Sequence, residues 1–206
     1  MSVLSAIVAT VFTPFRSKAL AMGDDYRRRL IPYLAEAIPP ATLLLDVGCN
    51  DGKVGAGVMA LRPELEVHGC DIQTLLPSLI PRTLYDGNHL PYADNSFDVV
   101  MAVDVLHHTR DIPKLLNEMT RVARRWVVVK DHQVGGVLDH WRIGIGDFLL
   151  NAPWGIPCTF NYPRRGQWQK LFTQAGLSNH REREDLDMGG KNRPLDHPIF
   201  VGEKRA

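Results

Sequence analysis

The feature that most constrains the fold of this chain is an apolar run that ends in an acid and passes into a glycine-containing turn. It reads Leu-Leu-Leu-Asp-Val-Gly-Cys-Asn-Asp-Gly over residues 43–52. A short apolar run bounded by turn residues is typical of a buried parallel strand, which we expect over residues 42–47. Gly48 and Gly52 let the backbone approach a ligand closely. The helix expected over residues 53–61 would direct its free N–H groups at the same place, so the segment predicts the first half of a nucleotide-type site.

Two further segments place acids at the ends of expected strands. A second strand over residues 65–70 ends at Asp71, where a carboxylate can accept hydrogen bonds from ribose hydroxyls. A third strand over residues 82–85 is followed by Asp86 and Gly87, and then by a Leu-Pro-Tyr turn. These acids extend the predicted site beyond the first turn.

The rest of the chain alternates strands with helices, which predicts a mostly parallel sheet covered on both faces. The remaining expected elements are a helix from Asp24 or Asp25 to about residue 37, a strand over 97–103, a helix over 112–123 capped by Asp111 with Pro113 in its first turn, a strand over 126–130, a helix over 166–176, and a closing hairpin of 180–185 and 199–204 around a polar loop at 187–197.

The turn follows the pattern G-x-N-x-G and not the G-x-G-x-x-G of dinucleotide sites. Together with its acid at residue 46, it resembles motif I of the class I S-adenosylmethionine-dependent methyltransferases, with Asn50 where that family usually has glycine. Later landmarks resemble the same family, so the resemblance covers residues 43–130 and is closest to the ubiquinone and menaquinone biosynthesis branch. It implies an α/β, Rossmann-like fold with a mostly parallel seven-stranded sheet, helices on both faces and an antiparallel C-terminal hairpin.

The resemblance also implies a cofactor, S-adenosyl-L-methionine, and its product S-adenosyl-L-homocysteine. Asp71 would hold the ribose, Asp86 with Gly87 would hold the adenine edge, and Asp46 would orient the turn or balance the ammonium group. For Asp71 and Asp86 the alternative is that each carboxylate only caps a turn. The full set of expected cofactor residues is Asp46, Gly48, Asn50, Gly52, Asp71, Ile72, Asp86, Gly87 and Asp104.

Candidate catalytic residues follow the fourth and fifth strands, at the edge of the sheet where ligands bind in such folds. They are His107, His108, Asp131 and His132. Methyl transfer mainly needs alignment, and a base is needed only if the acceptor must lose a proton. The alternative is that the two adjacent histidines merely shape the pocket. The histidines are scattered and lack the spacing of metal ligands, so no metal site is predicted.

Two segments outside this pattern are expected to cover the site. Residues 131–165 are rich in glycine, proline and aromatic residues, which predicts a lid insertion. Residues 1–22 carry an apolar helical stripe too short to span a bilayer, and the alternatives are a lid or a membrane-surface helix. The aromatic residues expected to form an apolar pocket wall are Trp141, Phe148, Trp154, Phe160, Tyr162 and Trp168.

Composition limits the remaining choices. The 206 residues suit one domain over 1–206, and a net charge of +1 gives no basic face for nucleic acid. Three cysteines without metal or disulfide spacing favour a structural role and a cytoplasmic location, with association at a membrane surface as the alternative. The resemblance implies a methyltransferase, and the expected apolar pocket wall favours a small apolar or aromatic molecule as its acceptor. A protein or RNA methyltransferase and a non-catalytic cofactor-binding module are the alternatives, and the oligomeric state stays open.

Overall fold

The computed structural model describes residues 22–74, 76–151, 158–184, 186–188 and 198–205. A helix over residues 22–37 comes first. The elements after it are β1 (Leu43–Val47), α2 (Lys53–Leu61), β2 (Glu66–Asp71), β3 (Arg82–Leu84), β4 (Phe97–Val103), the short 3-10 helix η1 (Leu106–His108), α3 (Ile112–Val122), β5 (Ala123–Lys130), α4 (Val137–Asn151), α5 (Gln167–Gln174), β6 (Leu177–Arg183) and β7 (Ile199–Lys204).

The strands form one seven-stranded sheet in the order β3-β2-β1-β4-β5-β7-β6. The first five strands of that order pair in parallel, whereas β7 runs antiparallel between β5 and β6. The predicted fold class is therefore confirmed, including its C-terminal hairpin. Because the chain runs outward from β1 to β3 and then returns to β4, the crevice between the carboxyl ends of β1 and β4 is the switch point where such sheets bind ligands.

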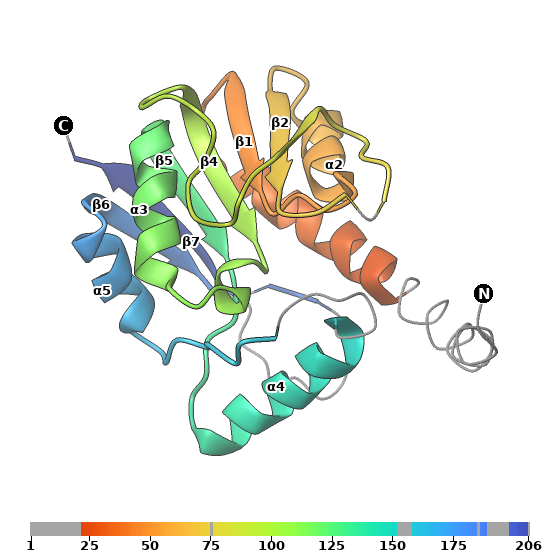
Figure 1. Ribbon diagram of the computed structural model, residues 1–206, viewed down its shortest axis with the longest axis vertical. Coiled ribbons are helices and arrows are strands. Elements are labelled where there is room, and N and C mark those ends of the chain that lie inside the picture. The colour runs from red at the N-terminus through yellow and green to blue at the C-terminus, as the bar shows by residue number, and fades with distance from the viewer. Residues whose placement is uncertain (1–21, 75, 152–157, 185, 189–197, 206) are drawn as a thin grey trace.

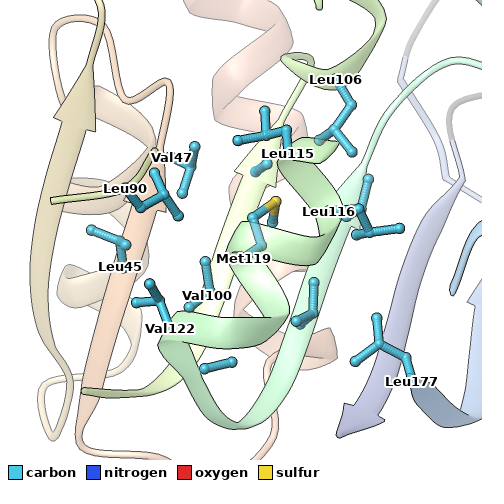
Figure 2. Packing of buried hydrophobic residues seen from close by; sticks show 14 of the residues in the cluster. Leu45, Val47, Leu90, Val100, Leu106, Leu115, Leu116, Met119, Val122 and Leu177 are labelled. Atoms are coloured by element: carbon cyan, nitrogen blue, oxygen red, sulfur yellow. The ribbon is translucent and has the colours of Figure 1, made fainter. Parts of the chain in front are cut away.

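Alternate residues of the central strands supply two separate cores. Leu45 and Val47 of β1 pack in the layer that contains α3 and α5, whereas Leu44 packs with the helix over 22–37 and with α2. Figure 1 shows α3 and α5 together on one face of the sheet. Figure 2 shows Met119 and Leu115 of α3 directed at the apolar side chains of β1 and β4. Strands buried on both faces explain why β1 reads as a continuous apolar run.

Most expected boundaries agree with the structure, and α4 is the main exception. Residues 131–165 were predicted as a lid insertion from their glycine, proline and aromatic residues, without a helix inside it, and 15 of them form α4. Gly144 and Gly146 lie inside this helix, where each costs about 1 kcal/mol relative to alanine. A Cβ atom on Gly144 would lie 2.4 Å from the ring of Phe160, so this glycine lets the returning chain approach the helix.

Smaller differences concern the edges of elements and the chain ends. β5 begins at Ala123, three residues before the expected start, and β6 spans Leu177–Arg183 instead of residues 180–185. The predicted helix over residues 1–22 and the loop over 187–197 lie almost entirely outside the described residues. Within the described part of the chain, no helix has the length and apolar character needed to cross a membrane.

Trp168 was expected in the pocket wall, and that prediction is wrong. Its side chain is fully buried in the main core, with its ring centroid 5.4 Å from that of Phe200 and 6.5 Å from that of Phe172. Its indole N–H donates to the carbonyl of His132 at 3.1 Å. Trp168 therefore fastens α5 to the segment that follows β5.

We expect Trp168→Ala to lower the free energy of unfolding by about 3–5 kcal/mol, because it removes a large buried ring and leaves a cavity. Trp141→Ala is the matched control, since 59% of Trp141 is exposed on α4, and it should change stability by less than about 0.5 kcal/mol. Urea denaturation followed by circular dichroism measures both. Equal losses in the two variants would contradict this assignment of the core.

Candidate active site

A pocket of about 480 Å³ opens at the carboxyl ends of β1, β2 and β4. Most of the residues expected to bind the cofactor line it: Asp46, Gly48, Asn50, Asp71, Ile72, Gly87 and Asp104. Gly52 and Asp86 are not part of its wall. The helix over residues 22–37 contributes Tyr26 and Arg27, which sequence reasoning did not assign to the site.

The turn after β1 has the left-handed backbone that its glycines suggested. Gly48 has φ +73° and Asn50 has φ +47°, so asparagine keeps the turn where the family usually has glycine. A Cβ atom on Gly48 would lie 2.4 Å from a methyl carbon of Val105 in the loop after β4. Gly52 has φ +71° and lies at the N-terminus of α2. The turn therefore packs closely against the loop after β4, and position 48 has room for glycine but not for a residue with a Cβ atom.

Asp71 holds the turn and also faces the pocket. One oxygen of its carboxylate accepts from the backbone N–H of Asn50 at 2.8 Å, and the other accepts from that of Gln73 at 3.1 Å. A carboxylate offers about four acceptor positions, so two remain for ligand hydroxyls. The turn-capping role and the ribose-binding role proposed from the sequence are therefore compatible at this residue.

Asp46 is the most unusual carboxyl group of the pocket. It is buried at the end of β1, and its Oδ2 atom has no hydrogen-bond partner among the described residues. Burial, together with the nearby charge of Asp71, raises the pKa of Asp46 to about 7. A buried acid of this kind is stabilised in its ionised form by a cation placed in the pocket.

Asp86 has the geometry of a turn cap. Its Oδ1 atom accepts from the backbone N–H groups of Asn88 and His89, both at 2.8 Å, and these bonds lower the pKa of its carboxyl group. Gly87, with φ +79°, lines the pocket beside it. The carboxylate of Asp86 thus fixes the loop that presents the backbone of Gly87.

A buried charged group that the sequence did not indicate lies on the other side of the pocket. Lys130, the last residue of β5, is fully buried, and its ammonium group lies 2.5 Å from Oδ1 of Asp104. Tyr26 donates to Oδ2 of Asp104 at 2.7 Å and is also bonded to Lys130. Asp104, with φ +55°, is therefore held by partners from two distant segments, which a local motif cannot reveal.

The two adjacent histidines have different surroundings. His107 is buried and its Nδ1 atom lies 2.5 Å from Oδ1 of Asp131, whereas His108 lines the pocket. Burial alone would lower the pKa of His107, but the charge and hydrogen bond of Asp131, together with Asp147, raise it to about 10. The pKa of His132 is instead lowered to about 4 by burial and by the charge of Lys130.

Asp147 is a second residue that the sequence did not reveal. It lies in α4, with Oδ1 at 3.5 Å from Nε2 of His107 and 3.7 Å from Nε2 of His108. Tyr162 donates to its other oxygen at 2.8 Å.

None of the aromatic residues expected in an apolar wall lines the pocket among those described, and Trp154 lies outside the described residues.

The cysteines have no sign of reactivity. Cys49 and Cys70 are free and buried beside the pocket turn. Burial raises the pKa of the Cys49 thiol to about 12 and that of Cys70 further still. Both thiols stay protonated at neutral pH, in agreement with the structural role expected for them.

Comparisons with known proteins agree with this geometry. A methyltransferase-domain family model matches residues 45–126. The chain is 34% identical to the methyltransferase GfsG of Streptomyces halstedii, over 65% of this chain and 52% of that protein. It is 28% identical to the ubiquinone/menaquinone biosynthesis C-methyltransferase UbiE of Desulfotalea psychrophila, over 52% of this chain and 48% of that protein. The chain thus spans about half the length of these curated relatives.

A solved structure supports the fold. The S-adenosylmethionine-dependent methyltransferase from Thermotoga maritima, described as a possible histamine N-methyltransferase, aligns with a TM-score of 0.64 over 96% of this chain and 99% of its own, at 13% identity. The segment matched by the methyltransferase-domain model, residues 45–126, contains the left-handed turn, the buried acids Asp46 and Asp71, and the pair His107 and His108. These similarities support a class I S-adenosylmethionine-dependent methyltransferase, and the relatives include proteins named for quinone biosynthesis.

Proposed function

We propose that this protein transfers the methyl group of S-adenosylmethionine to a small apolar or aromatic acceptor. The observation that carries the proposal is the pocket at the switch point, where a left-handed glycine turn lies between two buried carboxylates, Asp46 and Asp71. Such a pocket matches a ligand that combines ribose hydroxyls with positive charge.

The chain has a partner for each part of this cofactor. The unused acceptor positions of Asp71 take the ribose hydroxyls, and the backbone of Gly87 lies beside the adenine. Asp46 faces the ammonium group, and Gly48 leaves room for the methionine chain. When bound, the cofactor supplies an electrophilic methyl group on its sulfonium.

On the acceptor side we place the described residues of the insertion, 131–151 and 158–165. Thr159 and Asn161 donate to the backbone carbonyl of Thr109, at 3.2 Å each, and tie this insertion to the loop after β4. α4 lies beyond the carboxyl ends of the strands, at the bottom of Figure 1. It leaves Leu138, Trp141, Ile145 and Phe148 largely exposed. These exposed apolar side chains of the insertion favour an apolar acceptor, and the name of the UbiE relative refers to quinone biosynthesis.

Of the four expected catalytic residues, His108 has the catalytic role and the others position it. His108 lines the pocket, whereas His107, Asp131 and His132 are not among the residues of its wall. With no cation bound beside it, the carboxylates of Asp131 and Asp147 raise the pKa of His107 to about 10, which makes its ring a poor proton acceptor at neutral pH. Asp131 instead holds the backbone N–H groups of Leu106 and His107.

Calorimetry with S-adenosylmethionine and S-adenosylhomocysteine tests cofactor binding directly. We expect Asp71→Asn to weaken binding by about 1–3 kcal/mol, because it replaces a charged hydrogen-bond acceptor. Asp94→Asn is the control, since Asp94 is exposed and pairs only at the surface with Arg121, and it should bind as the wild type does. Absence of binding heat with the wild-type chain would refute the proposal.

Transfer of a labelled methyl group to quinol-like and other apolar acceptors then tests the acceptor class.

Cofactor affinity should increase with pH between about 6 and 8. Below its pKa of about 7, Asp46 is neutral and does not attract the ammonium group, whereas the ionised carboxylate does. If only the ionised form binds well, the dissociation constant falls up to about tenfold over this range and then levels off. In Asp46→Asn the slope should disappear. A dissociation constant independent of pH in the wild type would contradict the role of Asp46.

We expect His108→Asn to lower turnover about 100- to 10,000-fold while the affinity for cofactor stays within about twofold. The reason is that the variant removes the one imidazole on the pocket wall and keeps the polarity of the side chain. His68→Asn is the control, because His68 lies on β2 and pairs with Glu66. Steady-state kinetics with the labelled cofactor measure turnover. Wild-type turnover in His108→Asn would mean that alignment alone accounts for catalysis.

A further inference from the structure

Three metal-binding side chains converge between η1 and α4. One ring nitrogen of His107, one ring nitrogen of His108 and a carboxylate oxygen of Asp147 all lie within 4.8 Å of one another. Asp147 follows His108 by 39 residues in the sequence, which is why the spacing of the histidines gave no sign of a metal site. The grouping results from the packing of α4 against the loop after β4.

The two separations between Asp147 and the histidines are close to the distances between neighbouring donor atoms around a metal ion. Oδ1 of Asp147 lies 3.5 Å from Nε2 of His107 and 3.7 Å from Nε2 of His108. A tetrahedral ion with ligand distances of about 2.0–2.2 Å holds its donor atoms about 3.3–3.6 Å apart. The observed separations are longer than hydrogen bonds and close to these distances.

A second observation points to a ligand between these side chains. Nε2 of His107 is buried and makes no hydrogen bond to any residue that the structure describes. The other ring nitrogen, Nδ1, lies 2.5 Å from Asp131, so the imidazole is oriented with Nε2 toward Asp147. Metal-binding histidines usually have this arrangement, with a carboxylate on the nitrogen remote from the metal. Tyr162 likewise donates to the Asp147 oxygen remote from His107, at 2.8 Å.

We propose that His107, His108 and Asp147 bind a divalent transition-metal ion of the zinc type. Two imidazoles and one carboxylate suit such an ion, and three protein ligands leave the fourth position open, as in catalytic zinc sites. Because His108 lines the pocket, the ion would lie at the part of the pocket wall that His108 forms. Asp131 and Tyr162 are the positioning residues that orient two of the ligands.

The catalytic consequence rests on the proposed function, whereas the binding of the ion does not. The open position takes the hydroxyl oxygen of an acceptor, and the ion lowers the pKa of that hydroxyl as a Lewis acid. The hydroxyl proton leaves to water. The oxygen then forms a bond to the methyl carbon while the bond from carbon to sulfur breaks, and its electron pair stays on sulfur as a neutral thioether. His108 thus acts on the acceptor through the ion it holds.

Metal titration of the full chain, purified without a histidine tag and stripped with a chelator, tests the site. We expect one equivalent of zinc by calorimetry, and the visible absorption of tetrahedral cobalt when cobalt(II) is added instead. His108→Asn and Asp147→Asn should each weaken zinc binding about 100-fold or more, and Tyr162→Phe about 10-fold. Asp139→Asn in the same helix and His68→Asn on β2 are the matched controls and should bind zinc as the wild type does.

No zinc uptake in a titration carried to a large excess over protein would overturn the proposal, as would equal uptake by the wild type and the two ligand variants. In that case a protonated His107 between Asp131 and Asp147 accounts for the geometry. Binding of S-adenosylmethionine to every variant is measured in parallel, to show that each is folded. Cofactor binding without zinc uptake refutes the metal site alone, and zinc uptake without cofactor binding refutes only the proposed function.

Discussion

The acceptor side of the pocket depends on one buried carboxylate, that of Asp131. It accepts from the backbone N–H groups of Leu106 at 2.9 Å and His132 at 2.7 Å, and it holds Nδ1 of His107. These contacts join the loop after β4 to the end of β5. A fully buried charge is tolerated only when it is paired and hydrogen-bonded, and Asp131 has both kinds of partner. The orientation of His107, and with it the place of His108, follows from this carboxylate.

The charges around the pocket are arranged on two sides. Asp46 and Asp71 lie on the side of β1 and β2, where no basic residue is paired with Asp46 in the described structure. On the other side the carboxylate of Asp104 is balanced by Lys130 and bonded to Tyr26. A cationic ligand therefore gains most beside Asp46, because that carboxyl group has lost water and gained no protein partner. In the proposed binding mode, this asymmetry directs the methionine end of the cofactor toward Asp46.

The sequence predicted the strands and the turn that bring most of the expected cofactor residues to the pocket, because its signals there are local. The apolar run of β1, the glycines of the turn and the acid after β2 are adjacent to the elements they define, and the structure has them within a residue of the expected place. Asn50 could be assigned a left-handed backbone from its residue type alone, and its φ of +47° agrees.

The acceptor half could not be predicted in the same way because its signals are not local. Gly144 and Gly146 indicate a break by helix propensity, but α4 forms around them since tertiary packing outweighs a cost of about 1 kcal/mol each. Trp168 lies in an aromatic-rich stretch that was expected to form a pocket wall, but its side chain packs in the core. Contacts in the folded chain decide whether such a ring is buried, and the neighbouring residues in the sequence do not reveal those contacts. Asp147 and Lys130 become site residues only through contacts made by the folded chain.

The cofactor half and the acceptor half of the site also differ in how far the methyltransferase-domain match covers them. The methyltransferase-domain match ends at residue 126, before Asp131, α4 and the segment that carries Tyr162. The turn and the acids that hold the cofactor lie inside the match, so they explain the resemblance to methyltransferases with different acceptors. His107 and His108 also lie inside it, whereas Asp147 lies outside. The histidine pair of the matched segment is therefore contacted by a carboxylate that lies outside that segment, in α4, and the surroundings of the pair depend on this helix as well as on the matched segment.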